Sequence, residues 1–141
     1  MKVSKNFVLQ EFVTPEIYKK IKKLSVILLD PVIIDFAQFI RERFACPVYI
    51  NTWHLYGEKG LKYRGWRPHD CEVGAQYSLH KYGRAIDLSM DNYSPIEIYK
   101  DVVNNFNLYK DYITTTLTVE KTENFNHFDR RYVDSCMLNV I

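Results

Sequence analysis

The sequence predicts a small α+β domain in which helices pack on one side of a small, mostly antiparallel sheet. Two observations support this prediction. Capping residues followed by proline introduce segments whose apolar residues recur at helical spacing, and short apolar or alternating runs between them have the length of strands. The chain has 141 residues and neither a repeat nor a linker, so we expect a single domain over residues 1–141.

The first two helices are indicated by Thr14-Pro15 and Asp30-Pro31, because threonine and aspartate cap helices and proline fits their first turn. Apolar residues follow Pro31 at helical spacing, so one stripe of the second helix should be buried. That stripe consists of Ile33, Phe36, Ala37, Ile40 and Phe44.

Two strands and a long loop are expected in the middle of the chain. The run Val48–Trp53, after Pro47, has the character of a buried strand, and Ala85–Met90 that of a short second strand. Residues 54–77 between them lack a periodic pattern. They predict a long loop, and such loops in small domains are often functional.

A third helix and two further strands follow. Ser94-Pro-Ile-Glu97 has the form of a capping box, which indicates a helix start. The segment Tyr112–Glu120 alternates between apolar and polar residues, which predicts a strand with one buried face. A last strand is expected to begin near Asn126. The expected buried residues are Ile96, Tyr99, Val102, Val103 and Phe106 in the helix, and Ile113, Thr115, Leu117 and Val119 in the strand.

The composition excludes several classes of protein. A net charge of +2 gives no basis for nucleic-acid binding, which usually needs a strong basic bias, and we interpret the lysines between residues 19 and 23 as the solvated face of a helix. No apolar run is long enough to span a membrane, and residues 1–6 lack the features of a secretory signal. The three cysteines, Cys46, Cys71 and Cys136, form no Cys-x-x-Cys pair, so free thiols are expected.

The segment from Ser78 to Asp87 carries the residues that point to a chemical function. His80 and Asp87 flank a turn at Gly83, where glycine lets the chain turn sharply, and imidazole nitrogen and carboxylate oxygen are good zinc ligands. His127 is the natural third ligand, because the strand that carries it can lie beside Asp87. Three protein ligands leave a fourth position for water, which is typical of a catalytic rather than a structural zinc site.

Asp129 and Ser78 are candidates for supporting contacts around such a site. Asp129 lies two residues beyond His127, so on a strand both side chains point to one face, and the carboxylate can accept the ring N–H of a ligand histidine. A second metal site at His69–Cys71, with His54, is a much weaker hypothesis. Adjacent loop residues rarely close around one ion without another partner.

The spacing Ser-x-His-x-x-Gly-x-Ala-x-Asp, followed about forty residues later by His-x-Asp, resembles a known family. It is similar to the zinc D-Ala-D-Ala carboxypeptidases and L-alanyl-D-glutamate endopeptidases, which share their fold with the Hedgehog signalling domain. The resemblance covers nearly the whole chain, and the segments Asn6–Phe12, Arg41–Trp53 and Tyr63–Pro68 resemble the phage and prophage branch. It implies a Hedgehog-like fold that binds Zn²⁺ through the two histidines and the aspartate named above.

The sequence departs from this family at two positions. The family's tryptophan before the third histidine is replaced by Phe125, and the carboxylate that many members carry three residues before that histidine is replaced by Asn124. Glu120 and Glu123 are the nearby acids that remain as candidates for the catalytic base. We favour Glu120, because the phage branch has a Val-Glu pair at this place.

The resemblance implies hydrolysis of a peptide bond next to a D-amino acid in the stem peptide of peptidoglycan. Zinc would lower the pKa of a bound water, and a carboxylate would take its proton and return it to the leaving amine. Arg64 and Arg67, in the long loop, are candidates for stabilising the oxyanion or for holding the free carboxylate of a D-amino acid terminus. The alternative is a zinc-binding protein of the same fold without catalysis, with a structural or wall-binding role in a virion.

The expected setting follows from the same resemblance. We expect a protein that is made in the cytoplasm and acts on the cell wall after release, as endolysins do, or as part of a phage particle. The sequence shows no wall-binding repeat, so partners or the timing of lysis would supply the targeting. It contains no signal for a particular oligomeric state.

Overall fold

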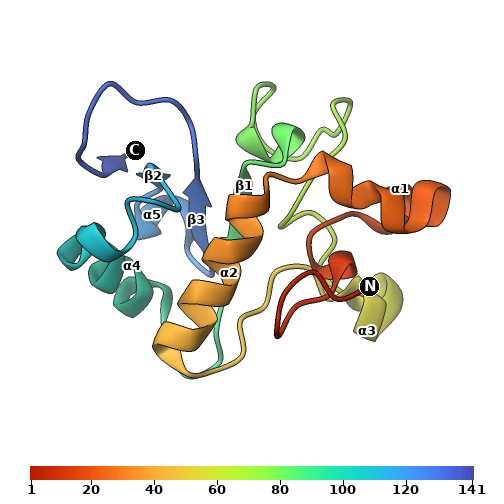
Figure 1. Ribbon diagram of the computed structural model, residues 1–141, viewed down its shortest axis with the longest axis horizontal. Helices are drawn as coiled ribbons and strands as arrows, with labels where there is room; N and C mark the ends of the chain where they lie inside the picture. The colour runs from red at the N-terminus through yellow and green to blue at the C-terminus, as the bar shows by residue number, and fades with distance from the viewer.

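The chain folds into five α-helices and a four-stranded mixed sheet, an α+β fold as predicted (Figure 1). The computed structural model describes residues 1–141. The helices are α1 (Pro15–Ile21), α2 (Pro31–Phe44), α3 (Trp53–Tyr56), α4 (Pro95–Asn104) and α5 (Val119–Thr122). The strands are β1 (Ala85–Leu88), β2 (Thr115–Thr116), β3 (Asn126–Asp129) and β4 (Asn139–Val140). Short 3₁₀ helices are η1 (Leu9–Glu11), η2 (Lys22–Leu28), η3 (Gly57–Lys59), η4 (Leu79–Tyr82) and η5 (Phe106–Leu108).

The three predicted helix starts are confirmed by their capping contacts. The Thr14 hydroxyl and the Asp30 carboxylate each accept a hydrogen bond from a backbone N–H of the first turn, at 3.5 and 3.0 Å. At the start of α4, the Glu97 carboxylate accepts a hydrogen bond from the Ser94 N–H at 2.7 Å. These contacts satisfy backbone N–H groups that have no partner within the helix itself.

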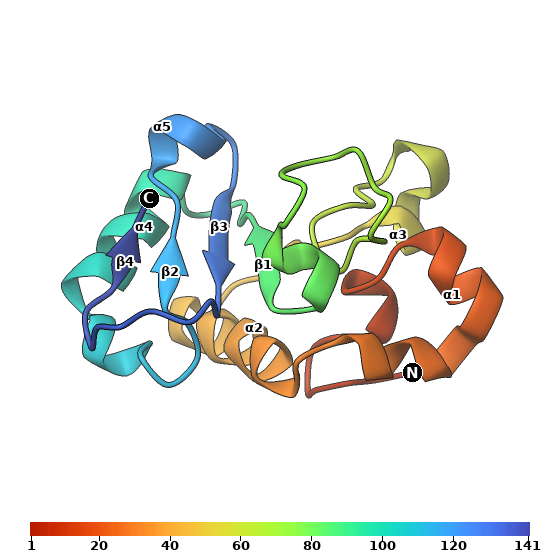
Figure 2. The ribbon, with the colours of Figure 1, turned by 90° about the horizontal axis from the view of Figure 1, so that it is seen from above.

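The sheet runs in the order β1-β3-β2-β4, as Figure 2 shows. β1 and β2 each pair antiparallel with β3, whereas β4, a strand the sequence did not predict, pairs parallel with β2. One face of the sheet packs on the two longest helices. The Phe128 ring of β3 meets the Phe36 ring of α2 with centroids 5.2 Å apart, and the Asn126 amide donates to the Pro95 carbonyl of α4 at 2.9 Å. The helices therefore cover one side of the sheet, as predicted.

The buried stripe was predicted correctly for α2 but not for α4. In α2, four of the five expected residues are buried and Phe44 is half-buried. In α4, Ile98 and Val102 are buried, whereas Ile96 and Val103 are 40% and 39% exposed. Apolar residues lie on more than one face of this short helix, so packing against β3, rather than spacing, selects the buried pair.

The segment Val48–Trp53 is not a strand. Tyr49 alone forms a bridge, with Ser89. The backbone N–H groups of Asn51 and Trp53 instead donate to carbonyls of η1 and of the long loop, at 3.0 and 3.1 Å, and Trp53 begins α3. The prediction failed because these apolar residues are buried by loops and not by a neighbouring strand.

The alternating segment Tyr112–Glu120 forms a strand only at Thr115–Thr116, and helix α5 follows almost at once. Both threonines are buried, although only one was expected inside. The Thr116 hydroxyl donates to the His127 carbonyl at 3.0 Å, so this polar side chain is satisfied within the sheet. Alternation therefore misidentified the exposed face, and it placed Glu120 on a strand when this residue lies on α5.

The loop predicted over residues 54–77 is irregular only from residue 60 to residue 78, because residues 54–59 belong to α3 and η3. Three backbone hydrogen bonds hold it in place. The Trp66 N–H donates to the carbonyl that follows η1 at 2.7 Å, the Arg67 N–H donates to the His80 carbonyl at 3.2 Å, and the Arg64 carbonyl accepts from the Asp87 N–H at 2.8 Å. The loop is thereby fastened to η4 and to β1, beside the predicted ligands.

Three features of the surface agree with the composition. No helix combines the length and the apolar character that crossing a bilayer would need, and α2, the longest, has 14 residues. The lysines between residues 19 and 23 are exposed, as a solvated helix face requires. All three cysteines are free, as expected.

Candidate metal centre

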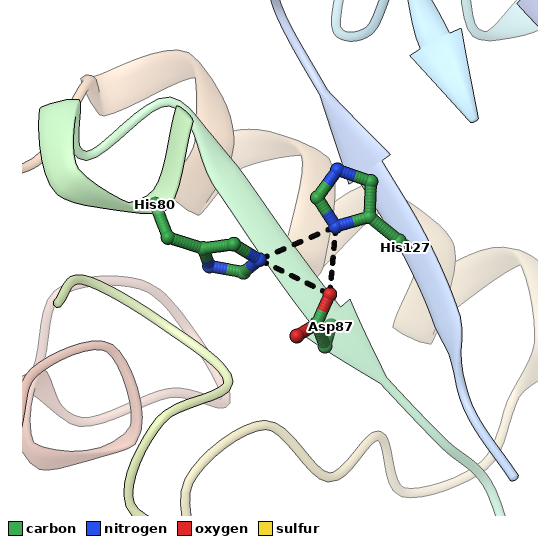
Figure 3. A group of neighbouring side chains, drawn as sticks. All are labelled: His80, Asp87 and His127. Atoms are coloured by element: carbon green, nitrogen blue, oxygen red, sulfur yellow. Dashed lines mark hydrogen bonds and ion pairs between the residues drawn. The ribbon is translucent and has the colours of Figure 1, made fainter. Parts of the chain in front are cut away.

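The pairing of β1 with β3 brings two of the predicted ligands together. Asp87 lies directly opposite His127 in the antiparallel register, and Ile86 lies opposite Phe128. Because side chains alternate along a strand, Ile86 and Phe128 face the helices while Asp87 and His127 share the other face. His80 reaches the same place from η4, the turn that precedes β1 (Figure 3).

A tight turn at η4 positions His80. The Ser78 hydroxyl accepts a hydrogen bond from the His80 N–H at 3.4 Å and caps the turn. Gly83 ends it with φ +68, and a Cβ at this position would lie 1.9 Å from the Leu28 carbonyl oxygen. Only glycine fits there, so the predicted turn glycine is confirmed. Ser78 supports the ligand through the backbone and does not touch its ring.

Three side-chain atoms of these residues converge. His127 Nδ1 lies 2.8 Å from Asp87 Oδ1, His80 Nε2 lies 3.1 Å from the same oxygen, and the two nitrogens lie 3.2 Å apart. Bonds of about 2.0–2.1 Å in a tetrahedral zinc site place ligand atoms about 3.3 Å apart. The spacing of this cluster therefore suits a metal ion of that size, and the buried cluster could hold one.

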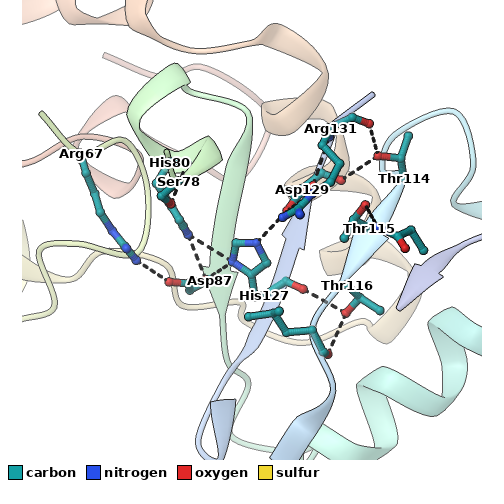
Figure 4. A network of polar contacts seen from close by, with 12 residues as sticks. Arg67, Ser78, His80, Asp87, Thr114, Thr115, Thr116, His127, Asp129 and Arg131 are labelled. Carbon is teal, nitrogen blue, oxygen red and sulfur yellow. Dashed lines mark hydrogen bonds and ion pairs between the residues drawn. The ribbon is translucent and has the colours of Figure 1, made fainter. Parts of the chain in front are cut away.

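The outer contacts of the two imidazoles determine where their protons lie. His80 Nδ1 is 2.8 Å from the Gly65 carbonyl, which can only accept, so this nitrogen carries the proton. His127 Nε2 is 3.0 Å from Asp129 Oδ2, so there the outer nitrogen also donates, in the contact predicted for Asp129 (Figure 4). In the neutral rings, Nε2 of His80 and Nδ1 of His127 therefore turn lone pairs toward Asp87. Three acceptors without a proton between them fit a bound cation.

Two arginines hold the carboxylates of this network. Arg67 Nη2 donates to Asp87 Oδ2 at 2.7 Å, the oxygen that does not face the histidines. Arg131 donates through Nε to Asp129 Oδ1 at 3.0 Å, and its Nη2 also contacts this carboxylate (Figure 4). Each carboxylate is thus fixed in orientation by contacts with both a guanidinium and a histidine.

Burial and hydrogen bonding shift the pKa values of these groups in different directions. Burial lowers the pKa of the His80 imidazole below its usual 6.5. Burial also opposes the charge of His127, but hydrogen bonds to Asp129 and Asp87 outweigh it and raise the pKa of this imidazole. Although burial opposes the charge of Asp129 too, hydrogen bonds from His127 and Arg131 bring its pKa down to about 2. The pKa of Asp87 is also lowered, because its contacts with both imidazoles outweigh its burial.

A cleft of about 500 Å³ gives access to the centre, and all three ligand residues line it. We call it the histidine lobe. Its other walls come from residues 74–79, Arg67, Leu117, Phe125, Arg131 and Ile141. Apart from Asp87, it has no acidic side chain.

A second cleft, of about 370 Å³, adjoins the first, and we call it the arginine lobe. It is lined by residues 60–64, Arg67, Val73, Asp87 and Phe125. The two lobes share Arg67, Asp87 and Phe125, so they meet at the candidate metal centre. A ligand longer than one residue can therefore extend to both sides of the centre.

The two arginines predicted to act on substrate are placed differently. Arg67 donates to Asp87, to the Tyr63 carbonyl and, at 3.3 Å, to the Val73 carbonyl. Its guanidinium therefore links the predicted metal ligand Asp87 to the long loop. The guanidinium of Arg64 lies 5.3 Å above the centre of the Phe125 ring, and its Nη1 donates to the hydroxyl of Ser89 at 2.7 Å.

The two glutamates proposed as a base lie outside both lobes. Glu120 is on α5 and Glu123 follows that helix, and both are exposed. The segment that carries them runs between Leu117 and Phe125, which do line the histidine lobe. The acids therefore lie on the segment that joins two residues of the cleft wall, and neither of them lines the cleft itself.

Glu123 has an unusual backbone conformation. Its φ of 58° and ψ of −67°, with a hydrogen bond of 2.7 Å from the Asn124 N–H to the Thr122 carbonyl, define a γ-turn of the rare, strained kind. Such strain costs about 1–3 kcal/mol in a residue other than glycine and tends to occur at functional sites. This observation favours Glu123 over Glu120 as the functional acid.

Sequence analysis missed two supporting residues and proposed one site that the structure does not assemble. The Gly65 carbonyl that orients His80 is a backbone group, which leaves no signal in a sequence. Arg131 could have been found, because it lies two residues after Asp129. His54 and the run His69–Cys71 are not part of any cluster that could hold a metal, and the group around His80 is the only one.

Comparison of the chain with protein-family models, with curated proteins and with solved structures finds no match.

Proposed function

We propose that this protein is a zinc peptidase that hydrolyses a peptide bond next to a D-amino acid in peptidoglycan. The single observation that carries the proposal is the convergence of three unprotonated ligand atoms, from His80, Asp87 and His127, at the meeting point of two clefts. A structural zinc would take a fourth protein ligand, and none is present in this cluster. The substrate class follows from the sequence resemblance to D-Ala-D-Ala carboxypeptidases and L-alanyl-D-glutamate endopeptidases.

The donor set suits zinc in particular. Two imidazole nitrogens and one carboxylate oxygen are common zinc ligands, whereas magnesium and calcium prefer oxygen alone. When bound, zinc supplies Lewis-acid chemistry that activates water and polarises a carbonyl. The Gly65 carbonyl and Asp129 fix both rings with the ligand nitrogen facing inward, and Arg67 fixes Asp87. Little reorganisation is then needed when the ion binds.

Hydrolysis also requires a group that moves a proton. Water adds its oxygen to the carbonyl carbon, the C–N bond breaks, and the leaving amine gains the proton that the water loses. We assign this transfer to Glu123, whose strained turn lies between α5 and Phe125 on the rim of the histidine lobe. Glu120, one turn earlier on α5, is the alternative.

The activity is tested with zinc-loaded protein and purified muropeptides, with new amino groups and product masses as the readout. We expect cleavage by the wild type and none by His80→Ala, which removes a ligand. Bound zinc is measured on both proteins, and circular dichroism confirms that the variant is folded. Cleavage by zinc-free His80→Ala at the wild-type rate would overturn the proposal.

A second candidate function is supported by a separate observation. Neither lobe contains an acid besides Asp87, and position 124 is an asparagine. A zinc-binding protein that attaches to the wall without cutting it would have such a site. It predicts stoichiometric zinc and binding to intact peptidoglycan, but no release of amino groups.

A further inference from the structure

Arg64 is the one arginine of the two lobes that has no carboxylate partner. Arg67 is paired with Asp87 at 2.7 Å, and Arg131 is paired with Asp129. Arg64 donates only through Nη1, to the hydroxyl of Ser89 at 2.7 Å. Its Nε and Nη2 make no hydrogen bond within the chain, so most of its N–H donors are free for another molecule.

The position of Arg64 makes this lack of a partner informative. The side chain is half-buried in the arginine lobe and lies over the Phe125 ring, 5.3 Å from its centre. Burial lowers its pKa, and the charge of Asp87, which makes no hydrogen bond to Arg64, offsets this only in part. A guanidinium that is partly desolvated and unpaired is costly, and its planar donors match a carboxylate bidentately.

We propose that Arg64 binds a carboxylate of the substrate in the arginine lobe, next to the scissile bond at the metal centre. This inference rests on the proposed function for the identity of the substrate. Two observations support it. Arg64 has free N–H donors in this lobe, and Asp87, a predicted metal ligand, lines the same lobe, so the lobe reaches the metal centre.

The rest of the arginine lobe suits a residue with a carboxylate and a short apolar part. Leu61, Tyr63, Val73 and Phe125 supply apolar walls, and the volume of about 370 Å³ is that of a small ligand site. The only acid in the lining is Asp87, whose oxygens face Arg67 and the histidines. No other acid in the lining would repel an incoming carboxylate.

The same lobe has a second cation, which is already neutralised. Lys62 lines the lobe, and its ammonium group lies 2.7 Å from the Glu58 carboxylate. Arg64 is therefore the group that gives the lobe its preference for an anion.

A peptidoglycan stem peptide offers this carboxylate from two sources. One is the free carboxylate of the terminal D-amino acid, and the other is the α-carboxylate of D-glutamate when it is linked through its side chain. The first source would make the enzyme a carboxypeptidase, with the terminal residue in the arginine lobe. The second would make it an endopeptidase.

The test uses two pairs of synthetic stem peptides with the zinc-loaded full chain. One pair differs only in a terminal acid against its amide, and the other in D-isoglutamate against D-isoglutamine. Both kcat/KM and the binding of each peptide by calorimetry are measured. We expect the wild type to prefer the acid in one pair by about tenfold or more, which matches the loss of a charge-assisted hydrogen bond. That pair identifies the source.

Variants of Arg64 and a matched control complete the design. Arg64→Gln should remove the preference by weakening the acid peptide, with little change for the amide, and Arg64→Lys should keep part of it. Lys59→Gln removes a cation at the end of η3, just before the loop, that lines neither lobe, and it should leave the preference intact. Zinc content and melting temperature are checked for each variant.

The outcomes separate this inference from the proposed function. Equal rates and equal binding for acid and amide in both pairs, or a preference that Arg64→Gln retains, would overturn the role of Arg64 even if the peptides are cut. Uncut peptides that still bind with an Arg64-dependent preference for the acid would overturn the peptidase and support the carboxylate site. If Arg64→Gln does not fold, the reduced preference of Arg64→Lys decides.

Discussion

Asp101 and Asp87 are each bound by an arginine, and the surroundings of these two carboxylates differ in one respect. Asp101, in α4, receives donors only: Arg43 Nε at 2.6 Å, Arg43 Nη2 at 2.7 Å, Asn105 at 3.0 Å and the Tyr109 hydroxyl. Asp87 receives Arg67 on one oxygen, but its other oxygen faces two ring nitrogens whose protons point away. Both oxygens of Asp101 receive donors from within the chain, whereas Oδ1 of Asp87 faces the two imidazole nitrogens and receives no donor when both rings are neutral.

This difference distinguishes a structural network from a binding site. Nearly all buried polar groups in native proteins have a hydrogen-bonding partner. A buried cluster in which acceptor atoms face one another without a donor therefore points to a partner from outside the chain. For Asp101 no partner is missing, and its lowered pKa follows from the hydrogen bond of Arg43. For Asp87, the metal ion of the proposed function would be that partner.

The largest expected effect comes from changing each aspartate to asparagine. Asp87→Asn should abolish zinc binding and lower the peptidase activity by about 10³-fold or more, because the amide removes a ligand charge and brings donors into the cluster. Asp101→Asn should keep full zinc occupancy and activity, and should lose about 1–2 kcal/mol of unfolding free energy. Metal analysis, activity and urea unfolding of both variants check the contrast. Retained zinc in Asp87→Asn would remove the distinction between the networks.

Removing the metal should destabilise the wild type. An ion present at about 1,000 times its Kd stabilises the fold by about 4 kcal/mol, so chelation should lower the melting temperature by about 10 °C or more. The His80→Ala variant is the control, since without a complete site its melting temperature should not respond to a chelator. Equal shifts in the two proteins would mean that the metal is bound elsewhere.

Changing Glu123 tests whether the site around Asp87 performs catalysis in addition to binding zinc. Glu123→Gln should lower kcat by about 10²-fold or more while zinc content and KM change little, because the amide cannot carry a proton between water and amine. Glu120→Gln, a change of the same kind on the same segment, should have a much smaller effect. A larger loss in Glu120→Gln would transfer the role to that residue, and full activity in both would favour the non-catalytic function.

The pH dependence of zinc affinity should separate the two histidines. The pKa of His127 is raised and that of His80 is lowered, so His127 is the first of the two to gain a proton as the pH falls. Zinc must displace that proton in order to bind. The affinity should therefore fall about tenfold per pH unit below the raised pKa, with a slope of one. Competition with a chelating dye between pH 8 and 5.5 measures it. A slope of two over the whole range would show that both rings titrate together.

The smallest effects concern two residues with left-handed φ. Ala45 ends α2 in the αL conformation with φ 50°, where glycine is ordinarily preferred, so Ala45→Gly should stabilise the fold by up to about 1 kcal/mol without any effect on activity. Glu123→Gly should stabilise it by a similar amount but abolish the activity. Denaturant unfolding and muropeptide cleavage on both variants check this. A destabilised Glu123→Gly would show that the γ-turn stores no strain.

The helices could be read from the sequence because their signals are local. Thr14, Asp30 and Ser94 cap the first turns of their own helices, and each capping contact is made with a residue two or three positions further along the chain. The strands depend on distant partners. Val48–Trp53 has the composition of a strand, but loops satisfy its backbone, and the polar Thr116 is buried because it bonds to a carbonyl of β3.

The site was predictable to the extent that side chains define it. His80, Asp87 and His127 were named from their spacing; the register of β1 and β3 brings Asp87 and His127 together, and η4 adds His80. The roles of Arg67 and Arg64 could not be separated by sequence. Both lie in one irregular loop. Only the tertiary structure shows that Arg67 holds the predicted ligand Asp87, whereas Arg64 lines a cleft and has no carboxylate partner.

The pairing of β1 with β3 also determines when the site can appear during synthesis. Asp87 and His127 are 40 residues apart in the chain, and they meet only when the two strands form their ladder. A nascent chain that carries β1 alone presents His80 and Asp87, too few groups to retain an ion firmly. Metal binding and any enzymatic activity would then arise together, only after both strands have been synthesised and have paired.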